Sequence, residues 1–165
     1  MIEQFWPFEH FYRTTLKISK EESDQVKIFM HNFKHSVDPT QVTTYQKLNI
    51  LSLPALKNLR SQIVEVLNFL NLNLDDNWAQ LYKENNFHVP HTHYGSEYSG
   101  VIYIEGNSPN GTSFLNPKGD VYTSEFKVND LILFPSYILH FVNVQQEDNN
   151  RIIISFNTKK GGNHG

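Results

Sequence analysis

The first half of the chain contains a segment whose apolar residues recur at helical spacing. Residues 19–22 read Ser-Lys-Glu-Glu, which is the spacing of a capping box, and the apolar positions that follow are Val26, Phe29, Met30 and Phe33. A capping box satisfies backbone N–H groups at the start of a helix, so we predict an amphipathic helix that begins near residue 19.

A second helical segment begins near Ser52. Ser52 is its predicted N-cap, and Pro54 falls in the first turn, where a proline removes no helical hydrogen bond. The apolar stripe of this segment consists of Leu56, Leu59, Ile63, Leu67 and Leu70. Both helices are expected to pack on a sheet as scaffold.

From about Trp78 onward, the helical pattern gives way to short β-type segments separated by turn residues. The predicted strands cover residues 98–106, 111–117, 124–128, 130–135, 139–144 and 151–157. The last two strands are expected to form a hairpin around a loop at 145–150. Many short strands at close spacing predict a β-sandwich or a barrel.

Length and composition favour one folded domain. The chain has 165 residues, of which 39% are hydrophobic and 19% charged. We expect the domain to cover residues 1–158, with residues 1–77 as helical and strand support and residues 78–158 as the core that carries the chemistry. Residues 159–165 are predicted to form a flexible tail.

Composition also excludes several kinds of site. The chain has no cysteine, which rules out disulfides, thiolate metal sites and cysteine nucleophiles. A net charge of −3 gives no field suited to nucleic acid or to an anionic membrane. No apolar run approaches about 18 residues and the N-terminus lacks a signal-peptide pattern, so we expect a cytoplasmic protein, in the host cytoplasm if it is viral.

Three of the eight histidines are placed where they could bind a metal. His91 and His93 are an i, i+2 pair, whose side chains share one face if they lie on a strand. His140 follows on a distant β-segment, and two such elements can form an open three-ligand metal site. The remaining histidines, including His88, are expected at the surface or at the edge of the core.

The expected hairpin adds an arginine to this site. With a loop at 145–150, His140 pairs with Ser155, and Arg151 lies on the same face, roughly 13 Å along the backbone. Its guanidinium could then bind the far carboxylate of a dicarboxylate held on the metal. The alternative is that Arg151 is a solvated charge beside a turn.

Taken in order, these segments resemble a known family. Residues 82–93 resemble the strand that enters the metal site in iron(II)/2-oxoglutarate-dependent oxygenases of the prolyl-hydroxylase-like group. Residues 98–106, 111–117 and 130–157 resemble the segments that follow, ending in a distal histidine, an arginine eleven residues later and a closing asparagine. The resemblance covers residues 78–158 and is closest to a bacterial and phage subgroup with an H-x-H…H…R pattern.

The resemblance implies a fold, a reaction and a set of site residues. The fold would be a double-stranded β-helix (jelly roll) preceded by helices. The reaction would be hydroxylation of a peptidyl residue such as proline, or of a small molecule, with iron(II), O2 and 2-oxoglutarate and with release of succinate and carbon dioxide. Ascorbate is a further candidate cofactor. The implied iron ligands are His91, His93 and His140, and the implied residues around the cosubstrate's distal carboxylate are Arg151, Tyr103 and Ser155.

Alternatives to this assignment stay open. The wider superfamily has Asp or Glu where His93 stands, so Glu97 is an alternative third ligand. A cupin-type metalloenzyme would bind one metal through His91, His93, Glu97 and His140 without 2-oxoglutarate, because Glu97 and Pro135 match parts of the two cupin motifs. A non-catalytic jelly-roll interaction module is the third possibility.

Overall fold

The computed structural model of the chain describes residues 3–4, 10–106, 111–146 and 150–162. In chain order its elements are β1 (Glu3–Gln4), β2 (Tyr12–Thr15), α1 (Lys20–Asn32), β3 (Val42–Thr43), two 3-10 turns (Ile50–Ser52 and Pro54–Leu56), α2 (Lys57–Phe69), β4 (Leu72–Tyr82), β5 (His88–His91), β6 (Tyr98–Glu105), β7 (Ser113–Leu115), β8 (Val121–Thr123), β9 (Asp130–Pro135), β10 (Leu139–Val142) and β11 (Arg151–Lys160).

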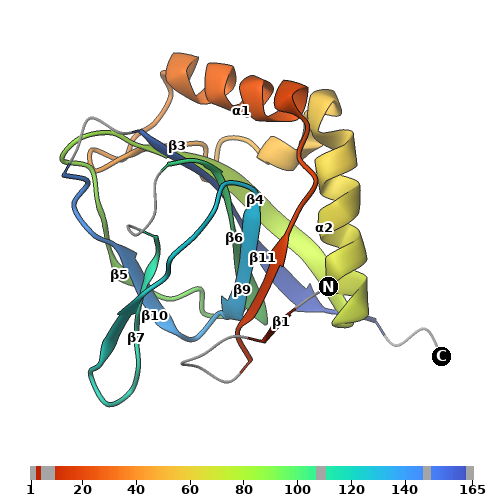
Figure 1. Ribbon diagram of the computed structural model, residues 1–165, viewed down its shortest axis with the longest axis vertical. Coiled ribbons are helices and arrows are strands. Elements are labelled where there is room, and N and C mark those ends of the chain that lie inside the picture. The colour runs from red at the N-terminus through yellow and green to blue at the C-terminus, as the bar shows by residue number, and fades with distance from the viewer. Residues whose placement is uncertain (1–2, 5–9, 107–110, 147–149, 163–165) are drawn as a thin grey trace.

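The strands form two antiparallel sheets. The larger sheet has the order β1-β2-β9-β6-β11-β4-β3, and the smaller has the order β5-β10-β7-β8. Figure 1 shows the smaller sheet beside the central strands of the larger one, with the helices beyond the larger sheet. The crossovers between the sheets are those of a double-stranded β-helix, which confirms the predicted fold class.

Buried side chains of the larger sheet alternate between its two faces. On β6, Val101 and Tyr103 belong to the core between the sheets, whereas Ile102 belongs to the core beneath the helices. On β11, Ile153 lies between the sheets and Ile154 faces the helices, as the predicted alternation along this segment requires. One face of each central strand is therefore free to build a site inside the jelly roll.

The two helices cover the outer face of the larger sheet and are joined by one carboxylate (Figure 1). The predicted capping box of α1 is present, because Ser19 and Glu22 exchange side chain-to-backbone hydrogen bonds. The carboxylate of Glu22 also accepts from the backbone N–H of Leu59 at 2.8 Å, in the first turn of α2. Neither described helix combines the length and apolarity that crossing a membrane would need.

The start of the second helix differs from the prediction. Two 3-10 turns precede α2, and Ser52 does not cap it; its hydroxyl instead donates to the carbonyl of Asn49. Since Glu22 supplies an acceptor from a neighbouring helix, α2 does not depend on a local N-cap. A long-range contact of this kind is invisible to a local sequence pattern.

One predicted strand and one predicted strand pairing were wrong. Residues 124–128 are irregular, and the strand β8 precedes them at Val121–Thr123. The expected hairpin between residues 139–144 and 151–157 does not form, because β10 pairs with β5 and β7 in the smaller sheet while β11 pairs with β4 and β6 in the larger. The intervening segment thus crosses between sheets, and His140 does not pair with Ser155.

The segment that was expected to enter the site as one strand is divided. β4 and β5 lie in different sheets, separated by a turn in which Asn85 has a φ of 65°. At the other end, β11 continues to Lys160, so the first residues of the predicted tail pair with β4. Residues 107–110, which precede the predicted strand at 111–117, residues 147–149 of the predicted loop at 145–150, and residues 163–165 lie outside the described residues.

Candidate metal centre

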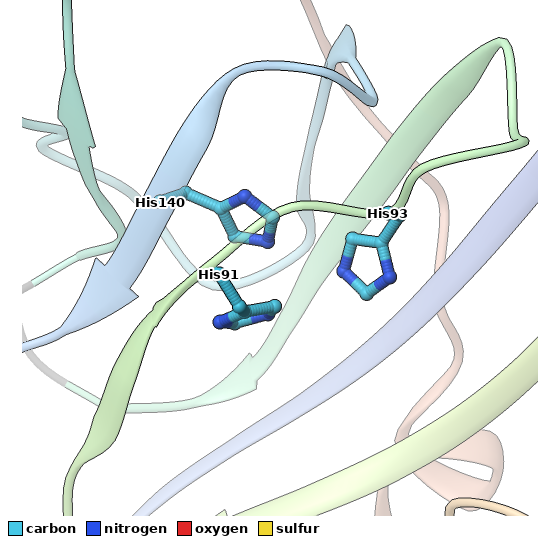
Figure 2. Close-up of side chains that lie close together, drawn as sticks. All are labelled: His91, His93 and His140. Carbon is cyan, nitrogen blue, oxygen red and sulfur yellow. The ribbon is translucent and has the colours of Figure 1, made fainter.

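The three histidines singled out by their spacing lie together at the edge of the smaller sheet. His91 ends β5 and is paired directly across from His140 on β10. His93 lies beyond the end of β5, and its backbone N–H donates to the carbonyl of Ser136, in the turn that precedes β10, at 2.9 Å. Figure 2 shows the three rings gathered around a common space.

The geometry of these rings suits one metal ion. Nitrogen atoms of His91, His93 and His140, one from each ring, lie within 4.8 Å of one another. The Nδ1 atoms of His91 and His140 contact the carbonyls of Val89 and Ile138 at 2.8 and 2.9 Å. Because a carbonyl can only accept, each Nδ1 carries the proton and each Nε2 keeps its lone pair for a metal.

The site keeps its imidazoles neutral. Burial lowers the pKa of His93 to about 4 and, with the neighbouring rings, holds the pKa of His140 well below its usual value. Burial also lowers the pKa of His91. Metal coordination requires the neutral form of histidine, so the three rings are in the correct state at neutral pH.

A fourth histidine, His88, lies beside the group and is partly buried, which agrees with its expected place at the surface or at the edge of the core. Its ring stacks on that of His91 with centroids 4.0 Å apart. Its Nδ1 lies 3.4 Å from the hydroxyl of Tyr82, and burial lowers its pKa to about 4. The stacking of His88 on His91 was not predicted, because residues three apart on a regular strand point to opposite faces.

Glu97 lies outside the metal group. Its side chain is exposed, and its backbone pairs with Thr158 and Ser136. Among the described residues, the group that could hold a metal consists of the three histidines without a carboxylate. The four-ligand arrangement of the cupin alternative is therefore absent from the described residues.

A pocket lies next to the three histidines, and polar side chains of β4 and β11 line it. Trp78, Gln80 and Tyr82 alternate along β4 and face the histidines, and the hydroxyl of Ser155 donates to Oε1 of Gln80 at 2.6 Å. The inner cavity between these groups is small, about 20 Å³. The sequence signal for Gln80 was a single polar residue within the otherwise apolar run Trp78–Tyr82, and it was missed.

Arg151 lies inside the jelly roll rather than in solvent. It is 3% exposed, its guanidinium carbon is 4.8 Å from the centre of the Tyr82 ring, and Nη1 donates to the carbonyl of Gly111 at 3.2 Å. Burial lowers its pKa, yet an arginine keeps its charge in proteins. Tyr82 contacts both this cation and His88, and so lies between the two parts of the site.

Tyr103 is placed near Arg151 but is occupied by other contacts. Its hydroxyl lies 3.0 Å from Oγ1 of Thr112 and 3.1 Å from Oγ of Ser124, and it accepts from the backbone N–H of Thr112. Its ring stacks on that of Phe126. Through these contacts Tyr103 holds Thr112 and Ser124 in place beside Arg151.

A second cavity opens on the other side of His91 and His93. It has a volume of about 220 Å³, and its wall includes Asp38, Gln41 and Trp78. We call it the outer chamber. Asp38 and Gln41 were not predicted to belong to a site, because they come from the first half of the chain, where no motif was found.

Comparisons with solved structures identify the fold. The chain is similar to the α-ketoglutarate-dependent epimerase SnoN from nogalamycin biosynthesis (TM-score 0.68, 12% identity, 91% of this chain and 76% of SnoN covered). It is also similar to HygX from Streptomyces hygroscopicus with nickel, 2-oxoglutarate and hygromycin B bound (0.64, 11%, 91% and 82%). A third similar structure is the viral collagen prolyl hydroxylase of Paramecium bursaria Chlorella virus-1 in its 2-oxoglutarate complex (0.61, 12%, 93% and 97%).

At these identities the likeness establishes a common fold, and the predicted resemblance to 2-oxoglutarate oxygenases is confirmed at that level. No curated protein matches the chain in sequence. The family profile described as "Cupin" matches residues 55–165, which include α2 and every strand from β4 to β11. The match covers more than half of the chain, and the protein therefore belongs to the cupin family.

Proposed function

We propose that the protein is an iron(II)- and 2-oxoglutarate-dependent oxygenase that hydroxylates a C–H bond of its substrate and releases succinate and carbon dioxide. The observation that carries this proposal is the group of three neutral imidazoles, His91, His93 and His140, inside a jelly roll of the oxygenase type. Three protein ligands leave coordination positions for a chelating cosubstrate.

The donor set fits a divalent first-row metal. Imidazole suits iron(II), and the carbonyl contacts of His91 and His140 fix which nitrogen faces the metal. The bound iron and 2-oxoglutarate would supply the oxidising chemistry. The role of the protein's own residues would be to hold these groups in a fixed geometry and to exclude water from them.

Arg151 is the residue we assign to the far carboxylate of 2-oxoglutarate. A carboxylate beside a buried guanidinium gains strongly, because few water molecules screen the pair there. The inner cavity of about 20 Å³ is too small for the whole molecule, so the side chains between Arg151 and the histidines must move when it binds. Tyr82 and Gln80 line that path.

A cupin-type metalloenzyme that acts without 2-oxoglutarate is the second candidate, and the family match favours it. The two candidates differ in what the metal-loaded protein binds. Both require a metal at the histidines, but only the oxygenase requires a 2-oxoglutarate site and the arginine.

The test is an anaerobic titration. Protein loaded with iron(II) should develop a weak visible charge-transfer band as 2-oxoglutarate is added, because chelation through the keto acid produces it. Succinate should then form when oxygen is admitted. Iron binding without the band and without succinate would contradict the oxygenase and favour the cupin alternative.

Replacement of the arginine tests the cosubstrate site separately. Arg151→Gln removes a charge-assisted contact of roughly 1.5–3 kcal/mol, so the affinity for 2-oxoglutarate, measured by the same band, should fall about tenfold to a hundredfold. Bound iron should be unchanged. Arg60→Gln, at an exposed position of α2, is the control and should match the wild type. Equal affinity in the two variants would contradict the assignment.

A further inference from the structure

The outer chamber is joined to the inner pocket by a chain of hydrogen bonds. Asp38 accepts from the side-chain amide of Gln41 at 2.9 Å, and Gln41 in turn accepts from Nε2 of Gln80 at the same distance. Gln80 accepts from Ser155 beside the histidines. Gln41, Gln80 and Ser155 are buried, so the chain fixes the polar groups on this wall of the chamber.

Asp38 is held as an oriented anion at one end of this chain. Its Oδ1 accepts from the backbone N–H and the hydroxyl of Thr40 at 2.8 and 2.7 Å, while Oδ2 accepts from Gln41. Burial acts to raise the pKa of this carboxyl, but the hydrogen bonds from Thr40 and Gln41 outweigh it and lower the pKa. A carboxylate offers about four acceptor positions, so within the described structure Oδ2 can accept one more donor.

The rest of the chamber is suited to a cation rather than to an anion. Among the described residues that line it, Asp38 is the only carboxylate, and the lining contains no lysine or arginine. Trp78 and Tyr45 also line it, edge to face, with ring centroids 5.0 Å apart. Aromatic faces attract ammonium groups, and a carboxylate next to them adds direct charge pairing.

We propose that the outer chamber binds the reacting group of the substrate and that this group carries an alkylammonium charge, which pairs with Asp38 while its carbon chain lies along Trp78 beside His91 and His93. This inference rests on the proposed function. A volume of about 220 Å³ lies below the roughly 300–1,000 Å³ of sites for drug-sized ligands, so it suits one ring or one short side chain. The ammonium group belongs either to a small amine or to a lysyl side chain, and the chemistry at Asp38 is the same for both.

The experiment measures binding by calorimetry to the full chain loaded with nickel(II) and 2-oxoglutarate, a state chosen to avoid turnover. The charged probes are butylammonium and cyclohexylammonium for small amines and N-acetyl-lysinamide for a lysyl side chain. The uncharged probes are butanol, cyclohexanol and N-acetylprolinamide. Each charged small amine should bind about tenfold or more tightly than its alcohol, because only the ammonium pairs with Asp38. Tighter binding of either charged class identifies the source and supports the proposal.

Variants identify the carboxylate that binds the ammonium probes. Asp38→Asn should lower the affinity for the ammonium probes about tenfold and leave that for the alcohols within about twofold. Asp76→Asn is the matched control, because Asp76 lies in the neighbouring groove on the other side of Trp78 and does not line the chamber. Thermal melting checks that both variants fold, and the comparison of amine with alcohol in the wild type does not depend on any variant.

The results that overturn the inference are equal binding of amines and alcohols, preference for N-acetylprolinamide, no binding of any ammonium probe, or full ammonium affinity in Asp38→Asn. Failure of the proposed function looks different. It would appear as a wild-type protein that does not bind 2-oxoglutarate in the charge-transfer titration, whereas the amine titration, repeated on metal-free protein, still reports on the chamber.

Discussion

At the scale of single residues, the third imidazole determines the charge of the metal site. The resemblance to the oxygenases implies that His93 takes the place of a carboxylate ligand, and among the described residues the group that could hold a metal contains no acid. Three neutral ligands leave a divalent ion with its full charge, which favours an anionic, chelating cosubstrate. The charge balance of the site therefore agrees with 2-oxoglutarate, a dianion, as the further ligand.

The assignment of His93 leads to a prediction about bound iron. His93→Ala removes one of three ligands and should lose most of the iron under loading conditions that saturate the wild type. Glu97→Ala is the matched control and should keep the iron, because the side chain of Glu97 is exposed and outside the group. Metal analysis after identical loading decides between them. Iron retained in His93→Ala and lost in Glu97→Ala would give the ligand role to the glutamate.

Spacing alone was sufficient to single out the three histidines, because two short motifs in a β-rich segment limit where a metal can bind. It was not sufficient for His88 or Asp38. His88 contacts the site through a ring stack at the start of a short strand, and Asp38 reaches the chamber from a loop in the first half of the chain. Neither placement follows from local periodicity, since both depend on how distant segments pack.

At the scale of elements, the two helices depend on each other through Glu22. This carboxylate caps its own helix and accepts from Leu59 and Asn58 of α2. Burial acts to raise its pKa, but the hydrogen bonds that it accepts outweigh this and lower the pKa. A lowered pKa in the folded state means that the ionised form stabilises the fold.

Glu22→Gln should therefore lower the free energy of unfolding at pH 7 by about 1–3 kcal/mol. The difference from the wild type should be present above the unfolded-state pKa of about 4.3 and should shrink as the pH falls through the lower folded-state value. Urea denaturation at pH 7 and at pH 3 measures it. Glu21→Gln, one residue earlier at an exposed position, should show little effect at either pH. A pH-independent difference would mean that the charge of Glu22 plays no part.

The pairing of β6 with β11 leaves no space for a side chain at Gly100. A Cβ atom there would lie 2.2 Å from the ring of Phe156, which is fully buried and directly across the two strands. Gly100→Ala should cost about 1–3 kcal/mol of stability, because the Phe156 ring must leave its position in the core. Gly162→Ala is the control, since a methyl group at that position would have no described atom within 4 Å. Equal urea midpoints for the two variants would contradict this register.

The order of the strands was harder to predict than their positions. Residues 130–135, 139–144 and 151–157 were correctly predicted as β-segments, but β10 and β11 were assigned to one hairpin. A short polar loop between two apolar runs is the signature of a hairpin and also of a crossover between packed sheets. The faces of β11 were nevertheless predicted correctly, because alternation along a strand does not depend on its partner.

At the scale of the whole molecule, the fold buries His140 and Arg151 and partly buries His88, His91 and His93 in a jelly roll whose chain has a net charge of −3. For His88 and His93, whose pKa values are lowered to about 4, the unfolded chain binds more protons than the folded one between about pH 4 and pH 6.5, and the lowered pKa values of His91 and His140 act in the same direction. The free energy of unfolding of the metal-free protein should therefore fall in acid, and the histidines around the proposed metal site are the cause. A bound metal opposes it, since it keeps its ligands deprotonated.

The stability of the metal-free protein should consequently fall as the pH is lowered from 7.5 to 5, and iron(II) or nickel(II) at about 100 times its dissociation constant should raise it by about 2.7 kcal/mol at pH 7.5. Urea titrations at several pH values measure both effects. His88→Gln removes a partly buried imidazole that is not in the ligand group, so the stability of this variant should decline less steeply between pH 6.5 and 5, while the metal-induced increment persists. His31→Gln, on the exposed side of α1, should keep the wild-type slope. A slope unchanged in His88→Gln would show that this ring is not held neutral by the fold, and a lost metal increment would make His88 a ligand.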